Sequence, residues 1–194
     1  MKEQFVPVTP DASVVQVLAR GVCPICTLMR SLQNTMVENA QKYPAAKLCN
    51  FHAWSLAHAS PARDAVTVLR TMLEEAPAKP LTGVTDLHPC DWCLTIRNHE
   101  QEKLMEYSRE LQRENFRNWV TQYGTICLFH GRRLIDMLPA AEVDLVRNIL
   151  ANNQDDLEKQ LAAFEIRIRR GESGGGGVLG HVTEFLVSQR GLTR

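Results

Sequence analysis

The sequence predicts an all-α fold, and three observations lead to that prediction. Apolar residues recur at helical spacing along most of the chain, and no stretch alternates apolar and polar residues as a half-buried strand would. A Cys-x-x-Cys segment followed by a Cys-x-x-His segment occurs twice. A run of glycines then separates a last apolar segment from the rest. We therefore expect a helical bundle built from two duplicated motifs, with a C-terminal helix after a Gly-rich linker.

Four helices are expected in the first half of the chain. A short one ends near Gly21, and a longer one ends at Tyr43-Pro44, because a residue that precedes proline avoids helical geometry. A third runs from about Asn50 to Ala59, and Pro61 suits the first turn of a fourth. The inward stripe of the second helix consists of Ile25, Leu28, Met29, Leu32, Met36 and Ala40. The inward stripe of the fourth consists of Val66, Leu69, Met72, Leu73 and Ala76.

Longer helices are expected in the second half. The segment from Pro77 to Pro89, with three prolines and a glycine, is typical of a connector. A long helix from about Asp91 to Tyr123 follows, and its charged pairs at i, i+3 indicate a solvated face. These pairs are Glu100–Lys103, Glu106–Arg109, Glu110–Arg113 and Glu114–Arg117. Another helix starts at Pro139 and extends to about Arg170, with an inward stripe that reaches Ile168. Four consecutive glycines are too costly in backbone entropy to be helical, so the last helix is expected from about Val178 to Arg190.

The duplicated motif supplies eight candidate metal ligands. The first copy contains Cys23-Pro-Ile-Cys26 and Cys49-Asn-Phe-His52, and the second contains Cys90-Asp-Trp-Cys93 and Cys127-Leu-Phe-His130. Each copy therefore offers three thiols and one imidazole, which is a full tetrahedral ligand set for zinc. All six cysteines of the chain are used in this way.

The similarity between the copies extends beyond the ligands. His52 and His130 lie 78 positions apart, and so do Pro61 and Pro139. The Cys-x-x-Cys segments lie only 67 positions apart, so the second copy carries 11 additional residues between its two ligand pairs. This register predicts an internal duplication with a first repeat over residues 1–80, a second over residues 81–170, a linker over 171–177 and a C-terminal helix over 178–194.

Each ligand pair is expected at the start of a helix. Cys23 occupies the N-cap position with Pro24 at the first helical position, and Cys26 lies three residues further on. Unpaired backbone N–H groups and the positive end of the helix dipole stabilise a thiolate there, which is the form that binds metal. The ligands can combine within a copy or across copies, and the shorter loop within a copy favours the first arrangement.

Composition limits the functions that this chain can have. The 22 basic and 22 acidic side chains balance, which argues against an overall nucleic-acid footprint, although Arg132-Arg133 could contact a phosphate. Two Zn²⁺ ions are the favoured cofactors, and 4Fe–4S clusters are the alternative because they also bind Cys-x-x-Cys pairs. Disulfides are disfavoured because the N-terminus lacks the apolar region of a secretory signal, which indicates a cytoplasmic protein. With all four ligand positions filled, hydrolytic catalysis is not favoured and no catalytic residue is assigned.

The segments Cys23-Pro-Ile-Cys26, Leu48-Cys-Asn-Phe-His52 and Ile126-Cys-Leu-Phe-His130 carry a resemblance to known proteins. The pattern resembles an uncharacterised group of bacterial and archaeal helical proteins with duplicated Cys-x-x-Cys…Cys-x-x-His motifs. The resemblance covers roughly residues 21–137 and implies a small cytosolic metal-binding protein, without an established activity.

Three hypotheses for function follow. The first is a zinc-stabilised module for protein interaction or regulation, with a protein partner or a homo-oligomer and no membrane association. The second is an iron–sulfur protein for electron transfer or redox sensing. The third is a nucleic-acid-associated regulator.

Overall fold

The computed structural model describes residues 9, 11–18, 22–43, 45, 47–75, 90–172 and 176–187. Within these ranges the chain forms nine α-helices and one 3-10 helix and no strand, which confirms the all-α prediction. No helix in this part of the chain combines the length and apolar character needed to cross a membrane. The elements are α1 (Val14–Leu18), α2 (Pro24–Glu38), η1 (Ala40–Lys42), α3 (Asn50–Ala59), α4 (Ala62–Glu75), α5 (Asp91–Leu111), α6 (Glu114–Tyr123), α7 (Leu128–Ile135), α8 (Ala140–Arg169) and α9 (Gly176–Val187).

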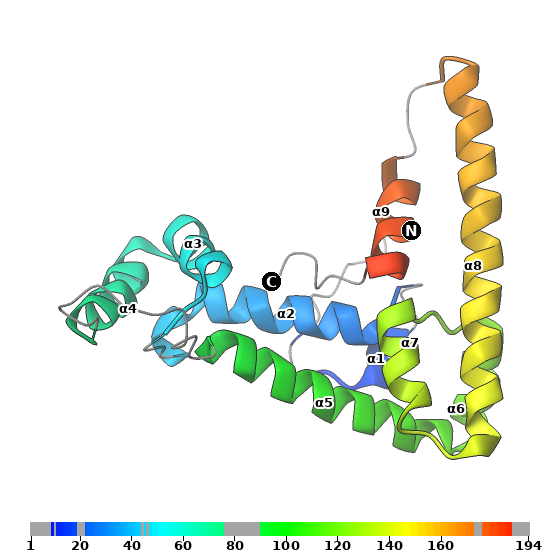
Figure 1. The fold of residues 1–194 in the computed structure, drawn as a ribbon, viewed down its shortest axis with the longest axis horizontal. Helices are drawn as coiled ribbons and strands as arrows, with labels where there is room; N and C mark the ends of the chain where they lie inside the picture. Colours follow the sequence, from blue (N-terminus) through cyan, green and yellow to red (C-terminus); the bar gives the residue numbers. More distant parts are fainter. Residues whose placement is uncertain are drawn as a thin grey trace, which may run out of the picture.

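Helices α2 and α5 lie side by side in the middle of the molecule and run in opposite directions (Figure 1). The start of α5 lies beside the chain that follows α2, because the Trp92 indole N–H donates to the Tyr43 carbonyl at 3.0 Å. The Asp91 backbone N–H likewise donates to the Lys47 carbonyl at 3.0 Å. At the other end, Tyr107 of α5 packs in the same core as Ile25 of α2. The pair therefore forms a rigid axis, with α3 and α4 at one end and the remaining helices at the other.

Each end of this axis has its own apolar core. The larger core fills the space between α1, α2, α5, α6, α7 and α8 and includes Leu28, Leu104, Tyr107, Val120 and Leu134. The smaller core joins the end of α2 to α3, α4 and the start of α5 through Met36, Leu56, Ala65, Val68 and Trp92. The stripe predicted for the second helix is confirmed, since its six apolar residues are all buried. The helix ends earlier than predicted, at Glu38, so Ala40 lies in η1.

The single helix predicted over residues 91–123 is wrong, because the chain breaks between α5 and α6 at Gln112 and Arg113. A helix turns by about 100° per residue, so Phe116 and Val120 would lie roughly opposite Tyr107 and Leu111 on one continuous helix. All four side chains are buried in the same core. The break lets α6 turn back, so that both apolar faces reach that core.

The register predicted for α4 is also wrong. Ala65 and Val68 are buried, whereas Val66 and Leu73 are 55% and 76% exposed. Leu69 and Met72 pack against the smaller core as predicted, and Ala76 lies outside the described residues. The inward face of α4 is thus rotated by about one residue, because packing against Leu56 and η1 decides which face is covered.

The C-terminal elements differ from the prediction in two respects. Helix α9 begins at Gly176, so two of the four consecutive glycines are helical after all. Helix α8 has the expected length, but its last turns extend beyond the core (Figure 1), and Ile168 is 56% exposed instead of inward. The connector expected from Pro77 to Pro89 and the end of the last predicted helix lie outside the described residues.

A buried ion pair attaches α1 to α5 and replaces one of the predicted surface pairs. Lys103 is only 9% exposed, and its ammonium group donates to the Ala12 carbonyl at 2.9 Å and to Glu106 at 3.0 Å. The other carboxylate oxygen of Glu106 accepts from the Val14 backbone N–H, which starts α1. Lys103 therefore does not pair with Glu100 on a solvated face.

We expect Leu104→Ala to lower the free energy of unfolding by about 2–5 kcal/mol, because a fully buried leucine leaves a cavity. Met105 is the matched control on the next position of α5, since it is 44% exposed. Met105→Ala should change stability by less than about 0.5 kcal/mol. Urea denaturation of both variants tests this, and equal losses would contradict the position of the core.

Candidate metal centres

The eight side chains singled out from the sequence gather into two groups that could each hold a metal ion. Cluster 1 consists of Cys23, Cys26, Cys127 and His130, and cluster 2 consists of Cys49, His52, Cys90 and Cys93. Within each cluster the ligand atoms all lie within 4.8 Å of one another. Each cluster combines the Cys-x-x-Cys pair of one copy with the Cys-x-x-His pair of the other. The expectation that ligands combine within a copy is therefore wrong.

The length of the helices explains this exchange. In both copies a helix separates the two ligand pairs, and α2 with 15 residues spans about 22 Å while α5 with 21 spans about 31 Å. A short flexible loop would favour pairing within a copy, but a helix is rigid and holds its ends apart. Because α2 and α5 are antiparallel, the end of each helix lies near the start of the other. The Cys-x-x-His pair that follows one helix thus meets the Cys-x-x-Cys pair that begins the other.

All four ligand pairs lie at helix starts, as the sequence predicts. The N-cap residues of α2, α3, α5 and α7 are Cys23, Cys49, Cys90 and Cys127. Two of these sulfurs accept from the backbone N–H three residues further on, at 3.5 Å from Cys93 to Cys90 and at 3.5 Å from His130 to Cys127. Each cluster therefore receives the positive ends of two helix dipoles, which stabilise thiolates.

The distances within the clusters suit one ion in each. In cluster 1 the Nδ1 atom of His130 lies 3.4 Å from Cys23, 3.4 Å from Cys26 and 3.1 Å from Cys127. In cluster 2 the Nδ1 atom of His52 lies 3.4 Å from Cys49, 3.2 Å from Cys90 and 3.4 Å from Cys93.

Sulfur–sulfur distances lead to the same conclusion. They are 3.6 Å between Cys26 and Cys127 and 3.8 Å between Cys49 and Cys93, and all six cysteines are free thiols. Zinc with bonds of about 2.3 Å to sulfur and about 2.0 Å to nitrogen separates tetrahedral ligand atoms by about 3.5–3.8 Å. Small side-chain shifts would therefore admit the ion, with Nδ1 as the histidine ligand atom in both clusters.

The pKa values of the residues in cluster 1 are shifted in opposite directions. Burial opposes ionisation of Cys23, but hydrogen bonds from Cys127 and Cys26 and the positive charge of His130 outweigh it and hold the pKa of Cys23 well below its usual value. Burial likewise disfavours the charged form of His130, yet the Cys23 thiolate raises its pKa well above the usual value. Hydrogen bonds to neighbouring sulfurs raise the pKa of Cys26. One thiolate is thus already stabilised, and a bound cation would displace the remaining protons.

Cluster 2 has a different electrostatic character. Burial alone lowers the pKa of His52 to about 4, so its imidazole is neutral near pH 7, which is the form that binds metal. Burial, and next the repulsion between its sulfur and those of Cys90 and Cys49, raise the pKa of Cys93 to about 12. A divalent cation would offset this repulsion between thiolates.

Glu100 lies beside cluster 1, and the sequence does not predict it as a site residue. Its carboxylate is 2% exposed and lies 2.9 Å from Nε2 of His130, on the opposite side of the ring from the sulfurs. The Arg133 guanidinium donates to the other carboxylate oxygen and, at 2.6 Å, to Gln101. Arg133 therefore belongs to the surroundings of cluster 1, although the sequence suggested a phosphate contact. No spacing rule connects positions 100 and 130, so only the tertiary structure reveals this contact.

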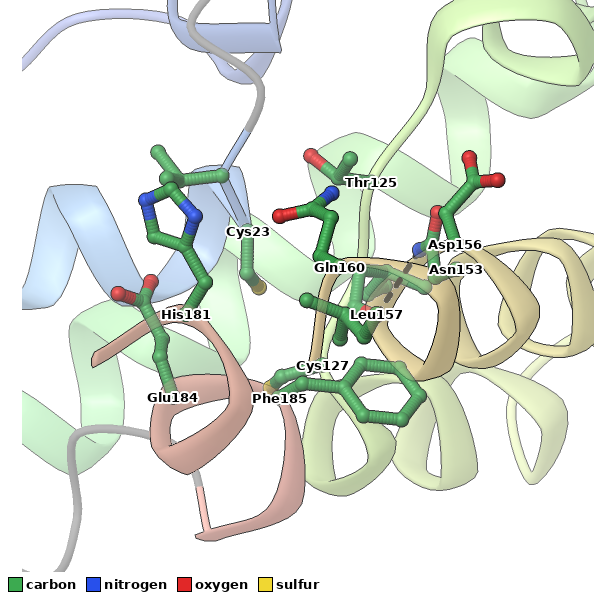
Figure 2. Close-up of a pocket in the computed structure, with 12 residues that line it drawn as sticks. Cys23, Thr125, Cys127, Asn153, Asp156, Leu157, Gln160, His181, Glu184 and Phe185 are labelled. Carbon is green, nitrogen blue, oxygen red and sulfur yellow. Dashed lines mark hydrogen bonds between the residues drawn. The ribbon is translucent and has the colours of Figure 1, made fainter. Parts of the chain in front are cut away.

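A pocket of about 140 Å³ borders cluster 1 under helix α9 (Figure 2). Cys23 and Cys127 line it on one side, while His181, Glu184 and Phe185 reach it from α9. Phe185 is 7% exposed, and the two cysteines are 4% and 1% exposed. Helix α9 therefore covers the side on which the sulfurs of cluster 1 would otherwise meet solvent.

Comparison with known protein families, with curated proteins and with solved structures finds no match for this chain. The resemblance to an uncharacterised bacterial and archaeal group is thus not supported by a family match. What the structure does support is the presence of two Cys/His clusters that could bind metal.

Pairs of cysteine substitutions test which ligands share an ion. We expect Cys26→Ser with Cys127→Ser to remove one ion per chain, because both residues belong to cluster 1. Cys26→Ser with Cys49→Ser should remove both ions, because one residue of each cluster is lost. Metal analysis by mass spectrometry measures the difference, with circular dichroism as the control for folding. Retention of one ion in the second double variant would show instead that the ligands of each ion come from a single copy.

Proposed function

We propose that this chain is a zinc-stabilised helical protein that acts through protein contacts and has no catalytic role. Two Zn²⁺ ions hold the starts of four helices together, with the three cysteines and the histidine of each cluster as ligands. The observation that carries the proposal is the pair of Cys₃His clusters at converging helix N-termini. We place the protein in the cytosol, where thiols stay reduced and available to metal.

The spacing of the ligands supports single zinc ions over iron–sulfur clusters. In a 4Fe–4S cluster each protein ligand binds its own iron, so the ligand atoms lie apart by the width of the cluster. Here all four ligand atoms of each cluster lie within 4.8 Å of one another. The protein supplies a complete tetrahedral set, which is typical of structural zinc and leaves no position for a substrate.

The energetic effect of the two ions would be large. Structural zinc contributes about 10–16 kcal/mol of apparent binding free energy. The net stability of a domain is about 5–15 kcal/mol, so loss of either ion would affect the fold. Cluster 1 would hold α2 to α7, and cluster 2 would hold α3 to α5.

Exposed apolar side chains support a role in protein contacts. Leu179 and Leu186 of α9 are 51% and 55% exposed, and Ile166 and Ile168 near the end of α8 are 51% and 56% exposed. Exposed apolar side chains that gather into a patch are characteristic of interaction surfaces. We propose that this α8–α9 arm binds a protein, with a second copy of the chain as the first candidate.

Nucleic-acid binding receives less support, since Arg133 is engaged by Glu100 and the formal charge of the chain is balanced.

We expect the purified protein to contain two zinc ions per chain and to lose helical structure when a strong chelator removes them. Elemental analysis and circular dichroism measure the two effects, and re-addition of Zn²⁺ should restore the helical signal. Visible absorption near 400 nm with stoichiometric iron, in protein purified without oxygen, would contradict the zinc assignment.

We expect self-association to depend on the exposed apolar residues of the α8–α9 arm. Ile168→Glu and Leu179→Glu should each shift the molar mass towards that of the monomer in light scattering coupled to size-exclusion chromatography. Leu73→Glu on α4 is the matched control, because Leu73 is 76% exposed but lies on a different helix. A wild-type chain that is monomeric at every concentration tested would rule out the second copy as partner.

A further inference from the structure

We infer that the two clusters bind metal unequally. Cluster 1 holds a permanent ion, and Glu100 is the residue that positions its ligand His130. Cluster 2 is an exchangeable Zn²⁺ site that controls the docking of α3 and α4 onto α5. This inference rests on the proposed metal binding and goes beyond it, because it assigns different roles to two sites with the same ligand set.

The first observation is the orientation of His130. With Nδ1 directed at three sulfurs, its Nε2 lies 2.9 Å from a Glu100 oxygen. The carboxylate is fixed in turn by Arg133, which also donates to Gln101. A carboxylate that accepts from the outer nitrogen of a ligating histidine fixes the tautomer and makes the ligand nitrogen more basic. Loss of such a contact typically weakens metal binding by about 10–100-fold.

His52 in cluster 2 has no such support. Its Nε2 atom is buried and has no hydrogen-bond partner among the described residues. The ring instead meets Phe51 and Trp92 edge-to-face, at centroid distances of 5.3 and 5.6 Å. With a metal on Nδ1, the outer nitrogen would carry a proton that no carboxylate accepts, which disfavours the bound state. Gln33 stands 67 positions before Glu100, in the register of the duplication, and does not supply the missing acceptor.

Burial differs in the same direction. All four residues of cluster 1 are buried, and α9 covers the adjoining pocket (Figure 2). In cluster 2, Cys49 and Cys93 are only half-buried. A chelating molecule from solvent can therefore approach Cys49 and Cys93 of cluster 2 directly, whereas the two sulfurs of cluster 1 that border the pocket belong to residues that are only 4% and 1% exposed.

The position of cluster 2 determines what its ion would control. Helices α3 and α4 contact the end of α2 through Leu56 and through a hydrogen bond from Ser60 to the Val37 carbonyl. Gln41 of η1 also donates to Asp64 of α4 at 2.6 Å. These contacts hold α3 and α4 to α2 and η1, whereas α3 meets the start of α5 at the shared site and through the contact of His52 with Trp92 beside it. Release of the ion would free this side of α3 while leaving the larger core intact.

The test is the release of Zn²⁺ from the full chain to a chromogenic chelator, 4-(2-pyridylazo)resorcinol, followed by absorbance. We expect two ions per chain to leave in two phases that differ at least 10-fold in rate. Cys93→Ser should abolish the fast phase alone. After the fast phase, hydrogen exchange should increase in α3 and α4 but not in α7.

Glu100→Gln is the decisive variant. It should accelerate the slow phase by roughly 10–100-fold and leave the fast phase unchanged. Glu102→Gln is the matched control on the same helix, since its carboxylate is 68% exposed and contacts His99 instead of a cluster. In ¹¹³Cd-substituted protein, Glu100→Gln should move only the resonance of cluster 1, which a merely structural role of Glu100 would not predict.

Other outcomes would overturn the inference. Release of both ions in one phase, or a slow phase that Cys93→Ser abolishes, contradicts unequal sites while leaving metal binding intact. An unchanged slow phase in Glu100→Gln shows that the carboxylate does not position His130. A chain that binds no metal overturns the proposed function and this inference together, and elemental analysis distinguishes that case from the others.

Discussion

The antiparallel contact between α2 and α5 is the constraint on which the rest of the structure depends. Each helix begins with a Cys-x-x-Cys pair and is followed in the chain by a Cys-x-x-His pair. A rigid helix cannot bring its own two ends together, so a complete set of four ligands forms only where two antiparallel helices exchange their ends. The duplication is thereby coupled to the fold, because neither copy holds four ligands at one place. The two apolar cores at the ends of the axis follow from the same arrangement, since each surrounds one exchanged cluster.

The buried charged side chains Glu100 and Lys103 both have partners that the fold supplies. Glu100 is 2% exposed, and both its oxygens are engaged, by His130 and by Arg133. An unpaired carboxylate at that depth would be costly, so the three side chains are stable only as a group. This dependence links α5 to α7 by an ionic contact next to the cluster that links α2 to α7. The larger end of the molecule is consequently held at several adjacent points.

The sequence predicts the candidate ligands and most helices because both are encoded locally. A Cys-x-x-Cys pair with a proline after the first cysteine indicates a helix start from its own neighbours, and Pro24 indeed opens α2. The partner of each pair is not encoded locally, since it depends on the direction in which α5 packs on α2. The break at Gln112 escapes prediction for a related reason. Neither glycine nor proline marks it, and only the requirement that Phe116 and Leu111 share a core forces the chain to turn. Glu100 has the sequence environment of a solvated helix, and its contacts with His130 and Arg133 depend on the position of α7.

The 11 additional residues of the second copy contribute to the difference between the two ends. They lie between Cys93 and Cys127, where the chain forms the longer α5 and the turn into α6, while the first copy has only α2 and η1 between its ligand pairs. The longer connection carries Phe116 and Val120 back into the larger core, in which the cysteines of cluster 1 also lie. Cluster 2 has the shorter connection and is covered by fewer side chains. One of them is Trp92, and the corresponding residue of the first copy is Ile25. Two sites with the same candidate ligands therefore acquire different surroundings from this change in length together with substitutions such as Glu100 in place of Gln33, and their chemistry can diverge without any change in the ligands themselves.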